Sequence, residues 1–476
     1  MSLLCGFVVA TISPFSPACL PMKPCFVLFL CTFGLISPTT GLAAESQSLD
    51  NWQFSFSGSH RSRLLTLDNP FRPGLSGSDQ ALSMRTLGRL QADRGALSLV
   101  IELQDSRNYL NDAGSGLTTH EINAVEPLQL YAAYNLKDTF RDGDALNLKA
   151  GLFTLGLGNQ RLVGRHGYRN TIQNFSGVQV QWQPTANSTL TTFWVMPVAI
   201  RPADPTGLLD NDIERDEADD ALQFSGIYYR TVPVAGGPTL ETYLFGLHEQ
   251  DEAGKAGTAD RELYTPGFRI LTSPAAGHWH YELELAYQWG SRRAGKQASD
   301  TRTLDVSATF VQANLGYTFP VAWQPRLALE WTRGSGDRQP GNVQFERFDG
   351  LFGPRREFGP TGIYGILGRS NFQSAALRLQ LEPAEGADVM LSLRHNTLAA
   401  ARDTFASSGV RDASGQAGKN AGDQFEFRVR HWLKPQVVRL EAGGAFYRNG
   451  SFFDHAPNAT GAGNPSFFYT DLTFFF

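Results

Sequence analysis

Polar and apolar residues alternate along many segments of this chain. In HYELELAYQW (280–289), tyrosines, leucines and a tryptophan occupy every second position, and glutamates and a glutamine stand between them. RLALEWTR (326–333) and SAALRLQLE (374–382) repeat the pattern. Because successive side chains of a strand point to opposite faces, each segment predicts a β-strand with one apolar face. A soluble sandwich alternates in the same way, so alternation alone does not identify the fold class.

The connections between these segments separate the two fold classes. Roughly eighteen segments follow one another from about residue 52, an even number as in bacterial outer-membrane barrels. Short connections lie at 92–95, 184–187, 232–238, 274–277, 382–388 and 434–436. Long connections lie near 61–81, 108–126, 154–174, 197–220, 291–303, 334–371, 397–422 and 449–465, and each follows an odd-numbered strand. The sequence therefore predicts an all-β, transmembrane antiparallel β-barrel, closed because hydrocarbon leaves no partner for an open edge, with short periplasmic turns and long extracellular loops.

The two ends of the chain predict its cellular location. Lys23 precedes the apolar run CFVLFLCTFGLI and a stretch of small residues, which is typical of a secretory signal peptide cleaved near Ala43 or Ala44. We expect 1–44 to be an over-extended start plus this signal, and 45–476 to be a single barrel domain. The final segment FFYTDLTFFF resembles the assembly signal of outer-membrane barrels. The expected partners are therefore the barrel-assembly machinery, outer-membrane lipid and lipopolysaccharide, in the bacterial outer membrane.

Charge and motif content exclude several functions. Residues after 44 contain 40 basic and 46 acidic side chains, a net charge of −6, which argues against nucleic-acid binding. All four cysteines precede residue 44, so no thiolate metal site is expected. The acidic run DNDIERDEADD (210–220) lacks the glycine-centred turn of an EF-hand, and we expect a solvated loop there. The sequence predicts no metal, no cofactor and no catalytic residue, although a catalytic group assembled only in space stays open.

One long connection is too apolar to be a solvated loop. In LFGPRREFGPTGIYGILGRSN (351–371), glycines and prolines oppose helix and strand, yet bulky apolar residues recur. We expect this loop to fold into the barrel and pack its apolar residues against the inner wall: Phe352, Phe358, Ile363 and Tyr364. Its arginines would then face the remaining water, because a guanidinium stays charged and matches carboxylates as a planar fork.

Strand parity and loop position together predict the residues that line the pore and bind its solute. All of them are arginines: Arg85, Arg89, Arg161, Arg165, Arg169, Arg355, Arg356, Arg369, Arg378, Arg394, Arg428 and Arg430. Alternatively, these arginines pair with Glu102, Glu330, Glu382 and Glu426 and only solvate the lumen, since pore interiors are polar in any case.

Three stretches resemble the alginate-export family of outer-membrane porins. They are LGRLQADRGALSLVIELQDSR (87–107), GNQRLVGRHGYRNTIQNFSGVQV (158–180) and RFDGLFGPRREFGPTGIYG (347–365). The resemblance implies a barrel of about eighteen strands, loops folded into the lumen, and an arginine-rich constriction for an acidic polysaccharide. The predicted function is a porin for a hydrophilic, acidic saccharide or polysaccharide of the alginate kind. A specific channel for small organic acids and a barrel enzyme remain as alternatives.

Overall fold

The computed structural model describes residues 51–112, 114–252, 256–297, 299–365, 367–461 and 463–476. The predicted signal peptide lies outside these described residues. The strands are β1 (Gln53–Asp68), β2 (Ser78–Arg94), β3 (Leu97–Tyr109), β4 (Asn123–Lys137), β5 (Ala145–Phe153), β6 (Phe175–Thr185), β7 (Ser188–Ala199), β8 (Glu217–Ala218), β9 (Leu222–Thr231), β10 (Thr239–Glu249), β11 (Glu262–Leu271), β12 (Trp279–Arg293), β13 (Thr303–Thr318), β14 (Arg326–Gly334), β15 (Gln344–Phe345), β16 (Phe372–Ala384), β17 (Ala387–Thr397), β18 (Asn420–Lys434), β19 (Val438–Asn449) and β20 (Ser466–Phe475).

In the part of the chain that the structure describes, helical structure is confined to short elements in the loops. They are α1 (Pro205–Asp210), η1 (Arg356–Phe358) and α2 (Ser451–His455). Among the described residues, no helix has the length and apolar character needed to cross a membrane.

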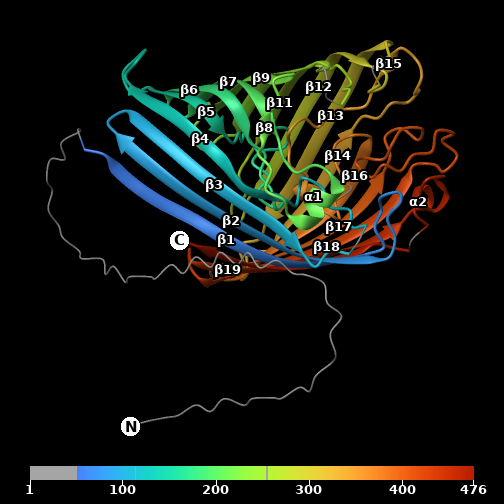
Figure 1. Cartoon of the computed structure of the whole chain (residues 1–476). Helices are drawn as coiled ribbons and strands as arrows, with labels where there is room; N and C mark the ends of the chain where they lie inside the picture. Colours follow the sequence, from blue (N-terminus) through green and yellow to red (C-terminus); the bar gives the residue numbers. More distant parts are fainter. Residues whose placement is uncertain (1–50, 113, 253–255, 298, 366, 462) are drawn as a thin grey trace, which may run out of the picture. The chain divides into compact units, whose positions relative to one another are not determined.

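The strands close into a barrel (Figure 1). Of the twenty strands, β8 and β15 are two-residue additions to the loops. The remaining eighteen strands pair antiparallel, each with its neighbours along the chain, and β20 pairs with both β19 and β1. Closure removes both edges of the sheet, so the backbone groups of the wall find partners without water. The predicted fold class is confirmed.

The last residue takes part in this closure. Phe476 N donates to Gly58 O at 3.1 Å, and Gly58 N donates to Phe476 O at 2.7 Å. A Cβ added at Gly58 would stand 2.4 Å from the Phe476 ring, so glycine leaves the room that this ring occupies. The ring also stacks on Phe56, with centroids 5.8 Å apart.

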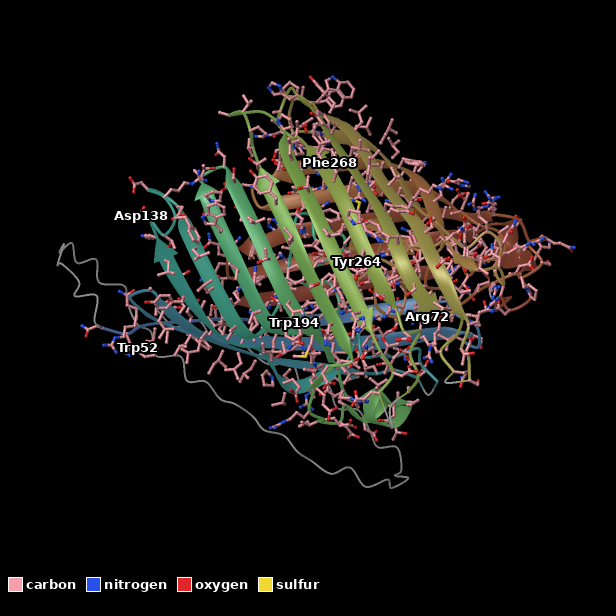
Figure 2. The ribbon with its side chains drawn as sticks, turned by 90° about the horizontal axis from the view of Figure 1, so that it is seen from above. Trp52, Arg72, Asp138, Trp194, Tyr264 and Phe268 are labelled. Atoms are coloured by element: carbon pink, nitrogen blue, oxygen red, sulfur yellow. The ribbon has the colours of Figure 1, made fainter. Side chains whose placement is uncertain are left out.

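The two faces of the wall differ as the alternation predicts. In β12, the side chain of Leu285 is exposed on the outer face, whereas Glu284 is 4% exposed and points inward. Trp194, Tyr264 and Phe268 belong to the same exposed outer face (Figure 2). An outer band of apolar and aromatic residues around a polar interior is the pattern of a barrel that sits in lipid.

Long and short connections lie at opposite ends of the barrel. β2 and β3 are joined by Gly95 and Ala96 alone, whereas 335–371 connect β14 to β16. Asp138, in the β4–β5 turn, and Arg72, in the β1–β2 loop, mark these two ends in Figure 2. The predicted sorting of long loops after odd-numbered barrel strands is confirmed, and a long β10–β11 connection (250–261) that the sequence analysis passed over follows the same rule.

One predicted loop is wrong in its extent. The sequence analysis placed a connection over 61–81, but β1 continues to Asp68 and β2 begins at Ser78. In HRSRL (60–64), Arg61 and Arg63 are each 4% exposed and point into the barrel. A lumen-facing strand can carry charge at every second position, and the apolar signal then comes only from its outer face.

Candidate functional site

Two long loops, 154–174 and 335–371, meet inside the barrel. Val163 and Phe352 form an isolated parallel bridge between them. Phe352 N donates to Leu162 O at 3.0 Å. A Cβ at Gly353 would stand 1.7 Å from Arg161 O, so this close approach of two backbones requires glycine.

The apolar residues of the longer loop hold it against the inner wall. Phe358 and Tyr364 are each 1% exposed, and Ile363 is 5% exposed. Phe352 is partly buried and packs edge-on against Phe175 of β6 at 5.2 Å between centroids. Burying aromatic side chains of this size contributes roughly 1.5–3 kcal/mol each, which explains why the loop leaves water. The predicted inward fold of this loop is confirmed.

Glu357 joins the two loops through ion pairs. Its carboxylate lies 3.0 Å from Arg161 Nε and 2.5 Å from Arg369 Nη2. Burial alone would raise the pKa of the Glu357 carboxyl, but Arg161 and Arg369 together lower it to about 2. Arg161 Nη1 also contacts two wall carboxylates, Glu282 at 2.8 Å and Glu284. Arg161 is therefore a buried cation surrounded by three acids.

The wall arginines of β16 and β17 share one acid. Arg378 Nε lies 2.8 Å from Glu330 Oε1, and Arg394 Nη2 lies 2.8 Å from Glu330 Oε2. Both arginines also donate to the backbone carbonyl of Glu357, at 2.9 and 3.3 Å. These side chains thus tie the wall to the infolded loop.

Arg428 and Arg430 of β18 lie farther toward the short-turn end. They share Asp388, at 3.0 and 2.7 Å. Among the described residues, neither donates a hydrogen bond to the infolded loops, so the structure does not bring this pair to the loop junction.

Arg356 is held by an acid and by an aromatic ring. Its Nη1 lies 2.6 Å from Glu426 of β18. Its guanidinium carbon lies 4.6 Å from the centroid of the Tyr168 ring, and that of Arg63 lies 3.9 Å from the same centroid. Tyr168 is therefore contacted by two cations, one from β1 and one from the loop, and each cation–π contact contributes about 0.5–2 kcal/mol.

Arg165 and Arg89 have ordinary polar partners. Arg165 Nη2 lies 2.7 Å from Glu102, an acid of β3 that is 5% exposed. Arg89 Nη2 donates to Gln91 Oε1 at 2.8 Å within the same strand.

Three wall arginines hold the backbone of residues 167–169, and the sequence analysis missed two of them. Arg61 donates to the Tyr168 carbonyl at 2.9 Å and to the Arg169 carbonyl at 3.0 Å. Arg63 donates to the Tyr168 carbonyl at 2.9 Å, and Arg85 donates to the Arg169 carbonyl at 2.8 Å. Charge at every second position in HRSRL was the signal that could have identified Arg61 and Arg63.

Arg269 of β11 was also missed. It lies 2.5 Å from Glu241 and 2.7 Å from Glu282. Its segment ELYTPGFRIL contains a proline and a glycine, which obscure the alternation.

Arg169 and Arg355 differ from the other predicted arginines in their partners. Among the described residues, neither forms an ion pair with a carboxylate. Arg355 Nη1 donates to the Ser407 hydroxyl, and the Arg169 guanidinium donates to no described residue. Burial and the neighbouring Arg355 lower the pKa of Arg169 to about 9. Burial, followed by Arg72 and Arg369, lowers the pKa of Arg355 to about 10.

The pairing that the alternative predicts is therefore present for part of the set. Glu102, Glu330 and Glu426 each pair with a predicted site arginine. Glu382 forms no ion pair with any residue that the structure describes.

Three cavities follow one another through the lumen. The central cavity, of about 500 Å³, is lined by seven arginines and three glutamates. The turn-side cavity, of about 620 Å³, shares Pro274, Arg326 and Gln380 with it and is lined by two arginines and three carboxylates. The loop-side cavity, of about 250 Å³, shares Asn159, Gln160, Pro354 and Arg356 with the central one. Arg165, Arg169, Arg355 and Arg356 line the loop-side cavity, and no carboxylate does.

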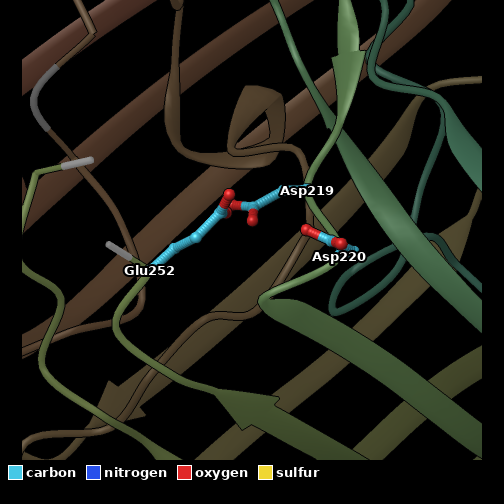
Figure 3. Close-up of side chains that lie close together, drawn as sticks. All are labelled: Asp219, Asp220 and Glu252. Atoms are coloured by element: carbon cyan, nitrogen blue, oxygen red, sulfur yellow. The ribbon is translucent and has the colours of Figure 1, made fainter. Parts of the chain in front are cut away.

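A group of acids lies outside this series. Carboxylate oxygens of Asp219, Asp220 and Glu252 lie within 4.8 Å of one another (Figure 3). Asp219 and Asp220 belong to the acidic run 210–220, and Glu252 comes from the β10–β11 connection. Asp216 of the same run accepts from Asn123 Nδ2 and Arg201 N, both at 2.8 Å, so this carboxylate holds the loop.

Comparison with known proteins agrees with the fold. The computed fold is similar to the crystal structure of Pseudomonas aeruginosa OccK2 (OpdF) in complex with glucuronate, with 14% sequence identity, a TM-score of 0.55, and coverage of 88% of this chain and 97% of that one. A BenF-like porin from Pseudomonas fluorescens Pf-5 matches with 12% identity, a TM-score of 0.56, and coverage of 88% and 99%. Acinetobacter baumannii OccAB1 matches with 10% identity, a TM-score of 0.56, and coverage of 89% and 96%. No curated protein sequence matches significantly.

Family membership follows from the sequence match. The family model for alginate export matches residues 52–465, which include nearly all of the barrel and both infolded loops. A closed eighteen-stranded barrel with an apolar outer band agrees with this match. This chain belongs to the alginate export family and is a porin channel of the bacterial outer membrane.

Proposed function

We propose that this porin passes hydrophilic, acidic saccharides or polysaccharides of the alginate kind through its arginine-lined lumen. The observation that carries the proposal is the excess of arginine over carboxylate in the central and loop-side cavities. Seven arginines face three glutamates in the central cavity, and four arginines face no carboxylate in the loop-side cavity. The chain beyond residue 44 has a net charge of −6, so this excess is local to the lumen.

A local excess of cations is what an anion-preferring channel needs. Low-dielectric walls focus the field of fixed charges into the water between them, and the field of the lumen then outweighs the charge of the whole protein. Guanidinium groups also bind carboxylates through two parallel hydrogen bonds, which suits a uronate unit. We therefore assign two roles to the twelve predicted arginines. Those paired with acids shape the channel, and those without an acid partner attract the solute.

A channel for small organic acids is the second candidate. The loop-side cavity of about 250 Å³ has room for a monosaccharide-sized acid, which favours a short solute. OccK2, whose fold is similar, was crystallised with glucuronate.

Single-channel block in a planar bilayer tests both candidates. Oligouronates added to one side should block the current at lower concentration than acetate or a neutral oligosaccharide of equal length. Block by short carboxylates and not by oligouronates would replace the first candidate with the second. Equal block by charged and neutral oligosaccharides would contradict both.

The remaining parts of the proposal concern the chain's surroundings. The barrel is embedded in outer-membrane lipid. We propose that residues 45–476 form one domain and that lipopolysaccharide is the lipid around the long-loop end of the barrel. The aromatic strand β20 is proposed as the segment that the barrel-assembly machinery recognises. Replacing Phe476 with Ala should lower the amount of folded barrel in outer-membrane fractions, whereas Phe54→Ala, an exposed residue near the short-turn end, should not.

A further inference from the structure

The loop-side cavity concentrates positive charge without internal compensation. Two of its four arginines are neutralised by acids outside the cavity lining, Arg165 by Glu102 and Arg356 by Glu426. Arg169 and Arg355 have no such acid among the described residues. The cavity therefore holds two uncompensated guanidinium groups, one from each infolded loop.

The nearest acid in electrostatic terms, Glu121, forms no ion pair with either guanidinium group among the described residues. Glu121 acts favourably on both guanidinium groups but does not contact either. Its Oε2 accepts from Thr118 N at 2.9 Å and from Thr118 Oγ1 at 2.8 Å. Burial raises the pKa of the Glu121 carboxyl.

Unused hydrogen-bond donors line the same cavity. The hydroxyl of Thr361 has no hydrogen-bond partner among the described residues, and Thr361 is 8% exposed. The Tyr168 hydroxyl and Arg169 Nε are also buried without a partner among the described residues. Buried polar groups without partners cost about 1–3 kcal/mol each, and native proteins contain few of them. Thr361 and Arg169 both line this cavity, and their unused donors suit a ligand that supplies acceptors.

We propose that the cavity between the two infolded loops is a binding site for a single oxyanion, a carboxylate or phosphate group, held by Arg169, Arg355 and Thr361. This proposal depends on the proposed function in one respect only, which is the identity of the molecule that carries the anion in the cell. The bound group would accept hydrogen bonds from both guanidinium groups and from the Thr361 hydroxyl. It would also bridge the loops, because Arg169 belongs to 154–174 and the other two residues to 335–371.

The size of the cavity sets which molecules carrying this group fit inside it. Its volume of about 250 Å³ has room for inorganic phosphate or for one monosaccharide acid. It continues into the central cavity through four shared residues, so a longer chain has room beyond it. The proposed site itself takes one anionic unit.

Thermal unfolding of the purified porin in detergent tests the site without any transport measurement. A ligand that binds only the folded state raises Tm. Sodium phosphate or sodium glucuronate should raise Tm above its value in sodium chloride of equal ionic strength, and glucose should not. A Tm shift with phosphate alone would mean that the site takes a phosphate group. A shift with both anions would mean that it also takes the carboxylate of a sugar acid.

Variants separate binding from a structural role. Arg169→Gln and Arg355→Gln should each abolish the anion-dependent shift, and Arg169→Lys should keep part of it. Arg230→Gln, which removes an arginine paired with Glu241 at 3.6 Å and outside the cavity, should keep all of it. In chloride, Arg169→Gln should not lower Tm, because it removes a repulsive charge that forms no hydrogen bond.

Two results would overturn the site. One is no anion-dependent shift in the unaltered porin. The other is an equal shift in Arg169→Gln. If either result is found while the porin still prefers anions in bilayers, the site is rejected and the proposed function stands. If the anion-dependent Tm shift is present but the porin shows no anion preference, the proposed function is rejected and the site stands.

Discussion

The central cavity and the loop-side cavity share four residues but differ in how their arginines are compensated. In the central cavity, Arg161, Arg369 and Arg378 each contact a glutamate at 3.0 Å or less. In the loop-side cavity, Arg169 and Arg355 have no acid partner among the described residues. We therefore propose that the arginines of the first region shape the pore and that those of the second supply the positive field that attracts anions.

The difference teaches that the number of arginines along a pore is a poor measure of its selectivity. A buried ion pair has little net charge, and its main effect is geometric, because breaking it leaves an uncompensated charge. An uncompensated guanidinium keeps its full field and is poorly screened by salt when it is buried. Ion selectivity should thus depend on the few uncompensated arginines, and the width of the pore on the many paired ones.

The largest expected effect comes from removing the infolded loop that lines both cavities. Deleting 350–370 should raise single-channel conductance several-fold, because the loop that obstructs the lumen is gone. Deleting 212–215, which are exposed residues of the acidic loop, is the matched control and should leave conductance unchanged. Equal conductance in both deletions would mean that the constriction lies elsewhere.

Removing the uncompensated charge should change selectivity most. The double variant Arg169→Gln with Arg355→Gln should lose most of the anion preference, since two positive charges leave a low-dielectric cavity. The reversal potential across a potassium chloride gradient measures it, at low ionic strength where screening is weak. A preserved reversal potential would contradict the division between the two regions.

Removing a compensating acid should act mainly on stability. Glu357→Gln leaves Arg369 without its acid, and breaking a buried pair costs about 3–5 kcal/mol. We expect the lower end, about 3 kcal/mol, since 25% of the Glu357 side chain reaches water. Chemical denaturation measures the loss, and anion preference should rise slightly. An unchanged unfolding midpoint would show that this acid does not hold the loop.

Removing both members of a pair should leave selectivity unchanged. Arg356→Gln with Glu426→Gln abolishes the contact at 2.6 Å and conserves net charge. The reversal potential should match that of the unaltered porin. A large shift would mean that the paired arginine acts on the solute directly.

The smallest effect is expected from mild acid. The pKa of the Glu357 carboxyl is lowered from 4.5 to about 2, so its ion pairs persist in the folded protein at pH 4. The stability that the ionised carboxylate contributes is complete above pH 4.5 and disappears as the pH falls to about 2. Conductance measured at pH 4 should therefore equal that at pH 7. A jump in conductance between these two values would indicate an early release of the loop.

Much of the fold could be predicted because it depends on local patterns. Alternation along single segments identifies the strands, and the lengths of the connections identify the two ends of the barrel. The apolar residues of 351–371 indicated an inward loop, and Tyr364, at 1% exposed, shows the burial expected of it. The prediction failed at 61–81, where a lumen-facing strand carries arginines that resemble a loop.

The candidate site could be predicted only as a set of residue types. The sequence by itself determined that arginines would concentrate in the lumen, since strand parity and loop composition are local properties. Only the tertiary structure decided which of them are compensated. Arg161 and Glu357 are separated by 196 positions in the sequence, yet they lie 3.0 Å apart. A charge's effect depends on neighbours within a few ångströms, and a closed barrel with infolded loops brings together neighbours that no local pattern records.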